Sequence, residues 1–232
     1  MARLPRLAVA GLPHLVVQRG HNGQAIFVDA ADRASYRAAL RDAARKAGVA
    51  IHAYGLLDGQ VRLLVTPESP QALSSMMQSV GRRYTAGFNQ RHGRSGTLWD
   101  GRFRATVVDA PAFLLSCMRF VEADAPDLDA EWSAETVSSS VPHHLGQWID
   151  PMVSDHTLYW ALGNTPFDRH ARFGALLREP LAPSLRDRVE AAVNKGWALG
   201  DATFVASLHA AGTRRVVPRR PGRPRKNISV PI

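Results

Sequence analysis

The sequence predicts an α+β fold, in which an antiparallel sheet carries helices on one face. Three observations in the first half of the chain predict it. Short apolar runs of strand-like character alternate with stretches in which apolar residues recur at helical spacing. Asp58-Gly59 lies between two of those runs and is a hairpin turn signal. The resulting order of strand, helix, two strands, helix, strand, helix is typical of helices packed on a sheet.

Each element of this order has its own local signal. Gly48 can end the first helix, and a proline at position 111 can begin the third. In the second helix, Tyr84 has the same helical phase as Val80 and Phe88, which places it in the core. The expected strands are residues 14–18, 49–57, 61–66 and 102–109, and the expected helices are residues 32–47, 71–90 and 111–122.

The second half of the chain changes character. An acidic run follows Val121 and is expected to be a solvated loop; its members are Glu122, Asp124, Asp127, Asp129, Glu131 and Glu135. Three further helices are expected at residues 166–178, 185–195 and 201–211. We therefore expect an α+β domain at 1–125, an irregular linker at 126–160, a helical region at 161–212 and a disordered basic tail at 213–232.

The charge of the chain is concentrated in that tail. The net charge is +9 over 232 residues, and seven basic residues lie within 13 positions: Arg214, Arg215, Arg219, Arg220, Arg223, Arg225 and Lys226. The rest of the chain is nearly neutral. A basic tail gains affinity for nucleic acid by releasing condensed counterions, so DNA is the expected partner and its binding should depend strongly on salt.

The tail also contains Gly222-Arg223-Pro224-Arg225-Lys226, which is similar to part of an AT-hook. A complete hook has an arginine before the glycine, where this chain has Pro221. Non-specific DNA binding is therefore the expectation, and a tail that only solvates the protein is the alternative.

Composition excludes several other classes of protein. A single cysteine, Cys117, excludes an internal disulfide and a cysteine-based metal site, and its apolar neighbours predict a buried thiol. No apolar run is long enough to span a bilayer, and Pro13 and His14 interrupt the start before a signal-peptide core could form. The expected location is cytoplasmic, without a membrane partner.

Three stretches of the chain resemble the REP-associated tyrosine transposases, which are bacterial relatives of the single-tyrosine insertion-sequence transposases of the HUH type. The stretches are residues 14–20, residues 77–103 with Gly81-Arg82-Arg83-Tyr84 and Gly96-Thr97-Leu98-Trp99-Asp100-Gly101-Arg102-Phe103, and residues 196–200 together with the tail. The resemblance covers nearly the whole chain and is weakest from residue 123 to 137. It implies a ferredoxin-like sheet with helices, and DNA transposition as the activity.

The resemblance also implies a chemistry. In that family a strand carries two histidines at alternate positions, which hold a divalent metal such as Mg²⁺ or Mn²⁺ against a phosphate of single-stranded DNA. A tyrosine on a later helix attacks the phosphate and forms a phosphotyrosine intermediate.

This chain departs from that pattern at three positions. The strand that usually reads Pro-Asn-His-Val-His-Leu-Leu is matched by residues 58–64, where Gln60 and Arg62 replace both histidines. The helix that usually reads Tyr-Arg-Tyr-Ile-Glu-Leu-Asn-Pro is matched from residue 117 to 124, where Phe120 replaces the nucleophile. Gln60 is a poor metal ligand and Arg62 would repel a cation. No catalytic residue is therefore expected to be intact, and no metal or other cofactor is expected.

Other side chains are candidates for DNA contact. A basic segment interleaved with Trp99 and Phe103 could bind single-stranded DNA by neutralising phosphates and stacking on bases; its members are Arg82, Arg83, Arg91, Arg94, Arg102 and Arg104. The alternative is a solvated helix face with both aromatics in the core. Arg62 could contact a phosphate directly or be solvated on an open face of the sheet.

The histidines at positions 143, 144 and 156 offer a weaker case for a metal site. Adjacent histidines in a strand point to opposite faces and no acid lies at a ligand spacing nearby, so a loop surface is expected.

Two other functions remain open beside a DNA-binding, catalytically inactive transposase-like protein. The first is an active transposase with unusual catalytic residues. The second is a regulator that binds duplex DNA through the helices at 185–195 and 201–211, arranged as a helix-turn-helix. For the inactive protein, single-stranded or hairpin DNA is the expected partner.

Overall fold

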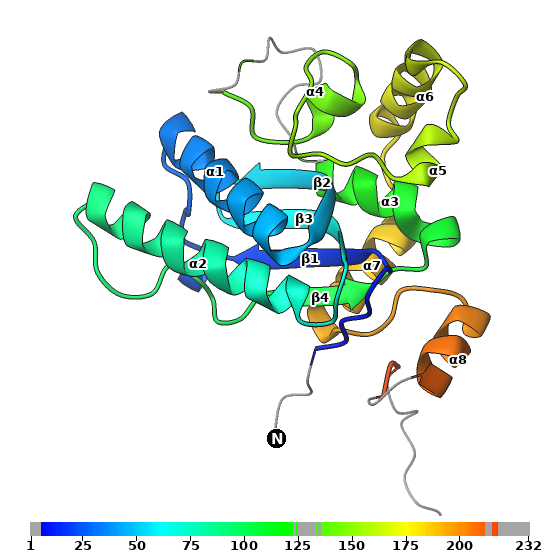
Figure 1. Ribbon diagram of the computed structural model, residues 1–232, viewed down its shortest axis with the longest axis horizontal. Coiled ribbons are helices and arrows are strands. Elements are labelled where there is room, and N and C mark those ends of the chain that lie inside the picture. The colour runs from blue at the N-terminus through cyan, green and yellow to red at the C-terminus, as the bar shows by residue number, and fades with distance from the viewer. Residues whose placement is uncertain (1–5, 123, 125–132, 134–135, 212–214, 218–232) are drawn as a thin grey trace, which may run out of the picture.

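The computed structural model describes residues 6–122, 124, 133, 136–211 and 215–217. Four antiparallel strands form one sheet in the order β2-β3-β1-β4 (Figure 1). The strands are β1 (His14–Arg19), β2 (Val49–Leu57), β3 (Gln60–Pro67) and β4 (Arg104–Val107). Leu57 pairs with Gln60 across the turn, so the predicted hairpin is confirmed.

The helices lie before, between and after these strands. In chain order they are the 3-10 turn η1 (His21–Gly23), α1 (Ala30–Ala47), α2 (Ala72–Arg91), α3 (Ala110–Glu122), α4 (Val141–His144), α5 (Thr157–Trp160), α6 (Pro166–Arg178), α7 (Pro183–Lys195) and α8 (Ala202–Ala211). The α+β class and the antiparallel sheet are therefore confirmed. The short helices α4 and α5 lie in the stretch that the sequence predicted to be irregular. The division of the chain into four regions stays a prediction.

Helices α1 and α2 lie side by side on one face of the sheet (Figure 1). Asp29 accepts a hydrogen bond from the backbone N–H of Asp32 and caps the start of α1, and Gly48 ends it in a left-handed conformation with φ 66°. The apolar stripe of α2 is buried against the sheet, and Tyr84 in that stripe is 2% exposed. The prediction that Tyr84 belongs to the core is confirmed.

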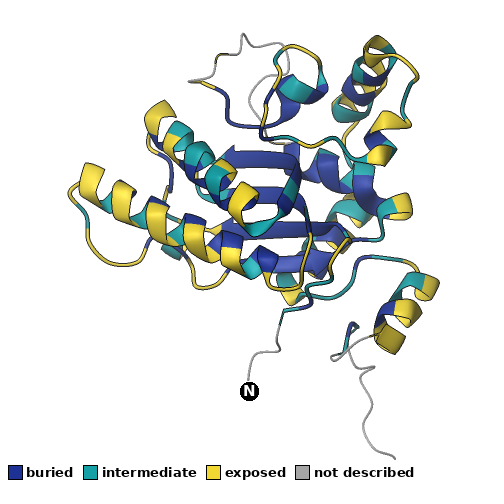
Figure 2. Cartoon of the chain, in the orientation of Figure 1, coloured by how far each residue is buried: buried dark blue, intermediate teal, exposed yellow. Residues whose placement is uncertain are grey.

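The opposite face of the sheet is also covered, which corrects the prediction of helices on one face only. Alternate residues of β1 enter different clusters, since Val16 packs with α1 and α2 while Leu15 and Val17 pack with α3, α6 and α7. Nearly the whole length of the strands is accordingly coloured as buried in Figure 2. The physical reason lies in β1 and β3, whose apolar residues are nearly continuous, as in strands covered on both faces.

Helix α3 makes a close contact with β2. A Cβ atom at Gly55 would lie 2.4 Å from the carbonyl oxygen of Val121, so a side chain there would force the two apart. Cys117 of α3 is buried as predicted, and burial raises the pKa of its thiol. The end of α3 is thereby fixed over β2 and the neighbouring β3, which decides where Phe120 lies.

The first residues of the tail are folded onto the body. Val216 is fully buried with Leu7, Val107 and Leu208, and its carbonyl accepts a hydrogen bond from the N–H of Ala198 at 3.0 Å. The prediction of a structureless chain from Arg214 onward is thus wrong for residues 215–217. Residues 212–214 and 218–232 lie outside the described residues.

The helices of the C-terminal region belong to different parts of the core. Helix α7 buries Val189 and Val193 with α3 and the sheet, whereas α8 buries Leu208 with the N-terminal segment. Within the part of the chain that the structure describes, α7 and α8 do not pack on each other as a helix-turn-helix pair, so that expectation was wrong. No helix in the described ranges is both long and apolar enough to cross a membrane.

His14 at the start of β1 gives the fold an expected pH dependence. It is fully buried as a neutral ring, because its Nδ1 donates to the carbonyl of Leu12 at 2.8 Å and its Nε2 accepts from the N–H of Val9 at 3.2 Å. Burial lowers the pKa of His14 to about 4. Since the unfolded chain takes up the proton near pH 6.5, stability is full above that pH and falls by up to about 3 kcal/mol as pH drops towards 4.

Denaturant unfolding between pH 7.5 and 4 measures this loss, and the imidazole chemical shift of His14 against pH reports its midpoint directly. His14→Gln is the matched control, because its unfolding free energy lacks this component of the pH dependence. A midpoint near 6.5 in the folded protein would contradict the expectation.

Candidate nucleic-acid interface

The three positions that the resemblance matches to catalytic residues lie on one face of the sheet or against it. Gln60 and Arg62 alternate along β3 and therefore point to the same side, towards α3. Phe120 lies in the last turn of α3, and its ring centroid is 4.6 Å from the guanidinium carbon of Arg62. The carbonyl oxygen of Phe120 accepts a hydrogen bond from Nη1 of Arg62 at 2.8 Å. Residues that the resemblance matched from distant motifs are thus in contact.

Arg62 is held inside the protein by a carboxylate. It is 6% exposed, and its Nη1 lies 2.7 Å from Oδ2 of Asp124. Burial lowers the pKa of Arg62 from its usual value and Asp124 offsets part of that shift, so the guanidinium remains a cation. The expectation of a solvated arginine on an open sheet face is wrong, because α3 and α7 cover that face. A phosphate would have to displace Asp124 to reach Arg62, and that contact stays a prediction.

The polar side chains of this face continue onto the neighbouring strands. Val17 pairs with Arg62 on one side and with Arg104 on the other, so these side chains share a face. Nη1 of Arg104 donates to Oδ1 of Asn194 on α7 at 3.0 Å. Gln60 lies at the end of β3, where it lines an open hollow with Arg19 and its neighbours. Helix α7 therefore covers one part of the face and leaves the Gln60 end open.

Most arginines of the predicted basic segment are paired with other parts of the protein. Arg83 pairs with Asp42 at 2.9 Å, Arg91 pairs with Asp29 and Asp32 on α1, and Arg94 donates to Gln24 at 2.9 Å. These contacts fix α2 against α1 and the loop after β1.

Two arginines of the segment differ from the rest. Arg82 and Arg102 are exposed and have no partner within the described ranges. Of the six, they are the side chains most available to an external phosphate.

The aromatic residues of the segment are core residues. Trp99 and Phe103 are each 8% exposed and belong to the cluster under α1 and α2. Trp99 packs against Tyr36 and Tyr84 with ring centroids 6.2 and 6.1 Å apart. The prediction that these rings interleave with the bases as a stacking surface was therefore wrong, and the alternative, both rings in the core, is what the structure has.

The tail arginines are described at one position only. Arg215 lies with its guanidinium carbon 5.5 Å from the ring of Trp197, beside the anchored Val216. The other basic residues predicted to bind DNA lie outside the described residues; they are Arg214, Arg219, Arg220, Arg223, Arg225 and Lys226.

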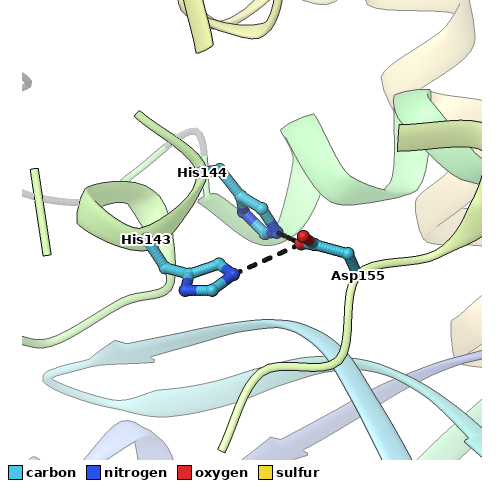
Figure 3. Close-up of side chains that lie close together, drawn as sticks. All are labelled: His143, His144 and Asp155. Atoms are coloured by element: carbon cyan, nitrogen blue, oxygen red, sulfur yellow. Dashed lines mark hydrogen bonds and ion pairs between the residues drawn. The ribbon is translucent and has the colours of Figure 1, made fainter. Parts of the chain in front are cut away.

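The adjacent histidines form a cluster and not a loop surface, which corrects the sequence prediction. Figure 3 shows His143 and His144 of α4 directed at Asp155, with Nε2 atoms 3.3 and 3.9 Å from its Oδ1. His144 is fully buried, and its Nδ1 lies 2.7 Å from Oε1 of Glu122. Successive residues of a helix are about 100° apart, so both rings can reach one acid where strand geometry would separate them.

Spacing alone would allow a metal ion in this cluster, since ligand atoms of His143, His144 and Asp155 lie within 4.8 Å of one another. The hydrogen bonds argue against His143 as a ligand. Its Nδ1 accepts the backbone N–H of Asp150 at 3.1 Å, so the proton of the neutral ring lies on Nε2. A protonated nitrogen has no lone pair for a metal, and His143 acts instead as a donor to Asp155.

The Glu122–His144 contact also corrects the prediction for the acidic run. Glu122 is 1% exposed and lies in the core, and Asp124 is the partner of Arg62. The remaining acids lie outside the described residues. No local pattern could have found this pair, because Glu122 and His144 come from separate helices.

Comparison with known proteins places the fold. No protein-family model and no curated protein matches the sequence. A solved structure described as a REP-associated tyrosine transposase bound to a REP hairpin is similar, with a TM-score of 0.50 and 13% identity over 67% of this chain and 92% of that chain. A putative transposase from Deinococcus radiodurans R1 matches with a TM-score of 0.35 and 23% identity over 50% of this chain and 93% of that chain. The first of these likenesses establishes the fold: the chain folds as a REP-associated tyrosine transposase does.

Proposed function

We propose that this protein binds DNA as a transposase-like protein and does not cleave it. The contact between Arg62 and Phe120 is the observation that carries the proposal. In the resembled family the same two positions supply a metal ligand and the attacking hydroxyl. Here one is a permanent cation and the other a phenyl ring without a hydroxyl, and the two side chains contact each other.

The residues around Arg62 do not fit the divalent metal that the family implies. Gln60 offers one neutral amide oxygen, Arg62 has no acceptor atom, and Phe120 has no polar side-chain atom. The nearby carboxylates are Asp124, which is neutralised by Arg62, and Glu190 of α7, whose charge also acts on Arg62. A divalent cation placed there would lose Asp124 as a ligand or face the guanidinium at short range. No step of a reaction is therefore assigned to a metal at this position.

DNA binding is supported from two sides. The solved transposase that shares the fold is bound to a REP hairpin. In this chain Arg82 and Arg102 are exposed, and the tail adds a block of basic residues suited to phosphates. Hairpin and single-stranded DNA are the proposed ligands.

A cleavage assay tests the proposal. With labelled hairpin and single-stranded DNA in Mg²⁺ or Mn²⁺, we expect a mobility shift, full-length DNA after denaturation, and no covalent protein–DNA adduct. Phe120→Tyr serves as the control and is expected to remain inactive, because the hydroxyl alone does not supply a metal ligand.

A denaturation-resistant adduct with the wild-type protein would establish the alternative, an active transposase with unusual catalytic residues. Absence of binding to both DNA forms at low salt would overturn the proposal itself.

A further inference from the structure

A hollow between α3, α6 and α7 is lined by three arginines that come from three different elements. Arg119 lies near the end of α3, Arg178 ends α6, and Arg186 lies in the first turn of α7. The other lining residues are Leu177, Glu179, Pro180 and Leu181. Guanidinium groups repel one another, so an anion bound between Arg119 and Arg186 would lower the electrostatic energy of the hollow.

The charge of this hollow is incompletely balanced from inside the protein. Nη2 of Arg119 donates to the backbone carbonyl of Glu179, and its Nε is buried without a hydrogen-bond partner. Arg119 pairs with no carboxylate in the described part of the chain. Arg186 shares Asp124 with Arg62 at 3.7 Å, and its side chain is 40% exposed. Glu179 is the acid among the lining residues, and Arg119 and Arg186 together carry more charge than it can balance.

The start of α7 adds to the positive electrostatic potential of the hollow. Its N-cap is Ala182, which offers no side-chain hydrogen bond, and no acidic residue lies in its first turn. The positive end of the helix is therefore uncompensated beside Arg186. Guanidinium groups next to a free helix N-terminus are the combination that proteins use for phosphate.

We propose that this hollow binds a phosphate of the DNA backbone, an inference that rests on the proposed DNA-binding function. Its position supports DNA over a free anion, because it adjoins the Arg62 site. Arg119 precedes Phe120 in the chain, and Asp124 links Arg62 to Arg186. A strand whose phosphate lies in the hollow passes along the end of α3, next to the place where the resembled family carries out cleavage.

The test measures DNA affinity against salt for the full-length protein and its variants. The variants are Arg119→Gln, Arg186→Gln and the double variant, each checked for folding by circular dichroism. Arg41→Gln is the matched control, since Arg41 is an exposed arginine of α1 on the other side of the sheet. We expect the double variant to lose about 0.7 to 0.9 from the slope of log K against log salt for the one phosphate released. The control should keep the wild-type slope.

Arg119→Lys separates the contribution of the positive charge from that of the planar guanidinium geometry. Lysine keeps the cation and loses the planar fork, so we expect a wild-type salt slope with weaker binding. A parallel titration with inorganic phosphate asks whether the hollow takes a free anion.

The outcomes distinguish this inference from the proposed function. Wild-type binding to DNA with equal slopes in the double variant and in Arg41→Gln would overturn the hollow and leave DNA binding intact. Phosphate binding that the double variant abolishes, without a change in the DNA slope, would assign the hollow to a free anion and would also overturn it. A wild-type protein that does not bind DNA would overturn both.

Discussion

Replacing His144 by alanine is expected to lower the free energy of unfolding by about 3–5 kcal/mol. His144 and Glu122 are both inaccessible to solvent and are joined at 2.7 Å. Without the imidazole, Glu122 keeps Ser140 as a partner but loses the group that offsets its burial. The ring also packs against Tyr159 and Phe173 at centroid distances of 4.9 and 5.1 Å, so its removal opens a cavity as well.

Equilibrium unfolding in urea measures this effect. His143→Ala is the control, because His143 and its partner Asp155 are both partly exposed. His143→Ala should lower the free energy of unfolding by less than half as much as His144→Ala does. A Glu122→Gln/His144→Ala double variant should recover part of the loss, since it removes the unpaired acid. A loss of less than about 1 kcal/mol in His144→Ala would contradict the buried contact.

Neutralising the tail is expected to have the largest effect on DNA binding. The variant changes the basic residues beyond the anchored Val216 to glutamine; they are Arg219, Arg220, Arg223, Arg225 and Lys226. Arg215 stays, because it lies against Trp197 and belongs to the folded body. If each of these five charges neutralises one phosphate, the slope of log K against log salt becomes shallower by about 3.5 to 4.5, and affinity at low salt falls about a hundredfold or more.

The measurement is a binding titration with hairpin, single-stranded and duplex DNA at several salt concentrations. A variant in which the order of the tail residues is permuted keeps the charge and should bind as the wild type does. Weak binding by the permuted tail would instead indicate that a defined motif, such as the partial AT-hook, reads the groove. An unchanged slope in the neutralised variant would refute the role of the tail.

Local signals in the sequence predicted the fold well where one residue decides the backbone. Asp58-Gly59 makes the hairpin turn, Gly48 ends α1, and Tyr84 follows its helical phase into the core. The second helical layer was missed because β1 and β3 are apolar on both sides, and periodicity alone does not say what covers the second side. Residues 215–217 were predicted to be disordered because the surrounding tail is strongly basic, although Val216 is apolar and is buried in the structure.

The candidate site was predictable only through the resemblance. It identified Gln60, Arg62 and Phe120 as one group, and the contact between Arg62 and Phe120 agrees with that grouping. The partner of Arg62 was not predictable, because Asp124 belongs to an acidic run that is typical of a solvated loop. The arginines around Trp99 and Phe103 led to the wrong prediction of a stacking surface. The same alternation of basic and aromatic residues arises where an exposed helix face borders the core.

The contact of Arg62 with Phe120 and Asp124 also bears on how the metal-dependent site of the resembled family could be built into this chain. Arg62→His would leave the Phe120 carbonyl and Asp124 without their shared donor, and the smaller ring would leave space behind. Phe120→Tyr would place a hydroxyl beside a guanidinium with no metal to use it. Each single substitution costs stability or supplies no metal ligand, so building such a site needs several substitutions together. Arg62 therefore stabilises the present arrangement of β3 and the end of α3 against single substitutions.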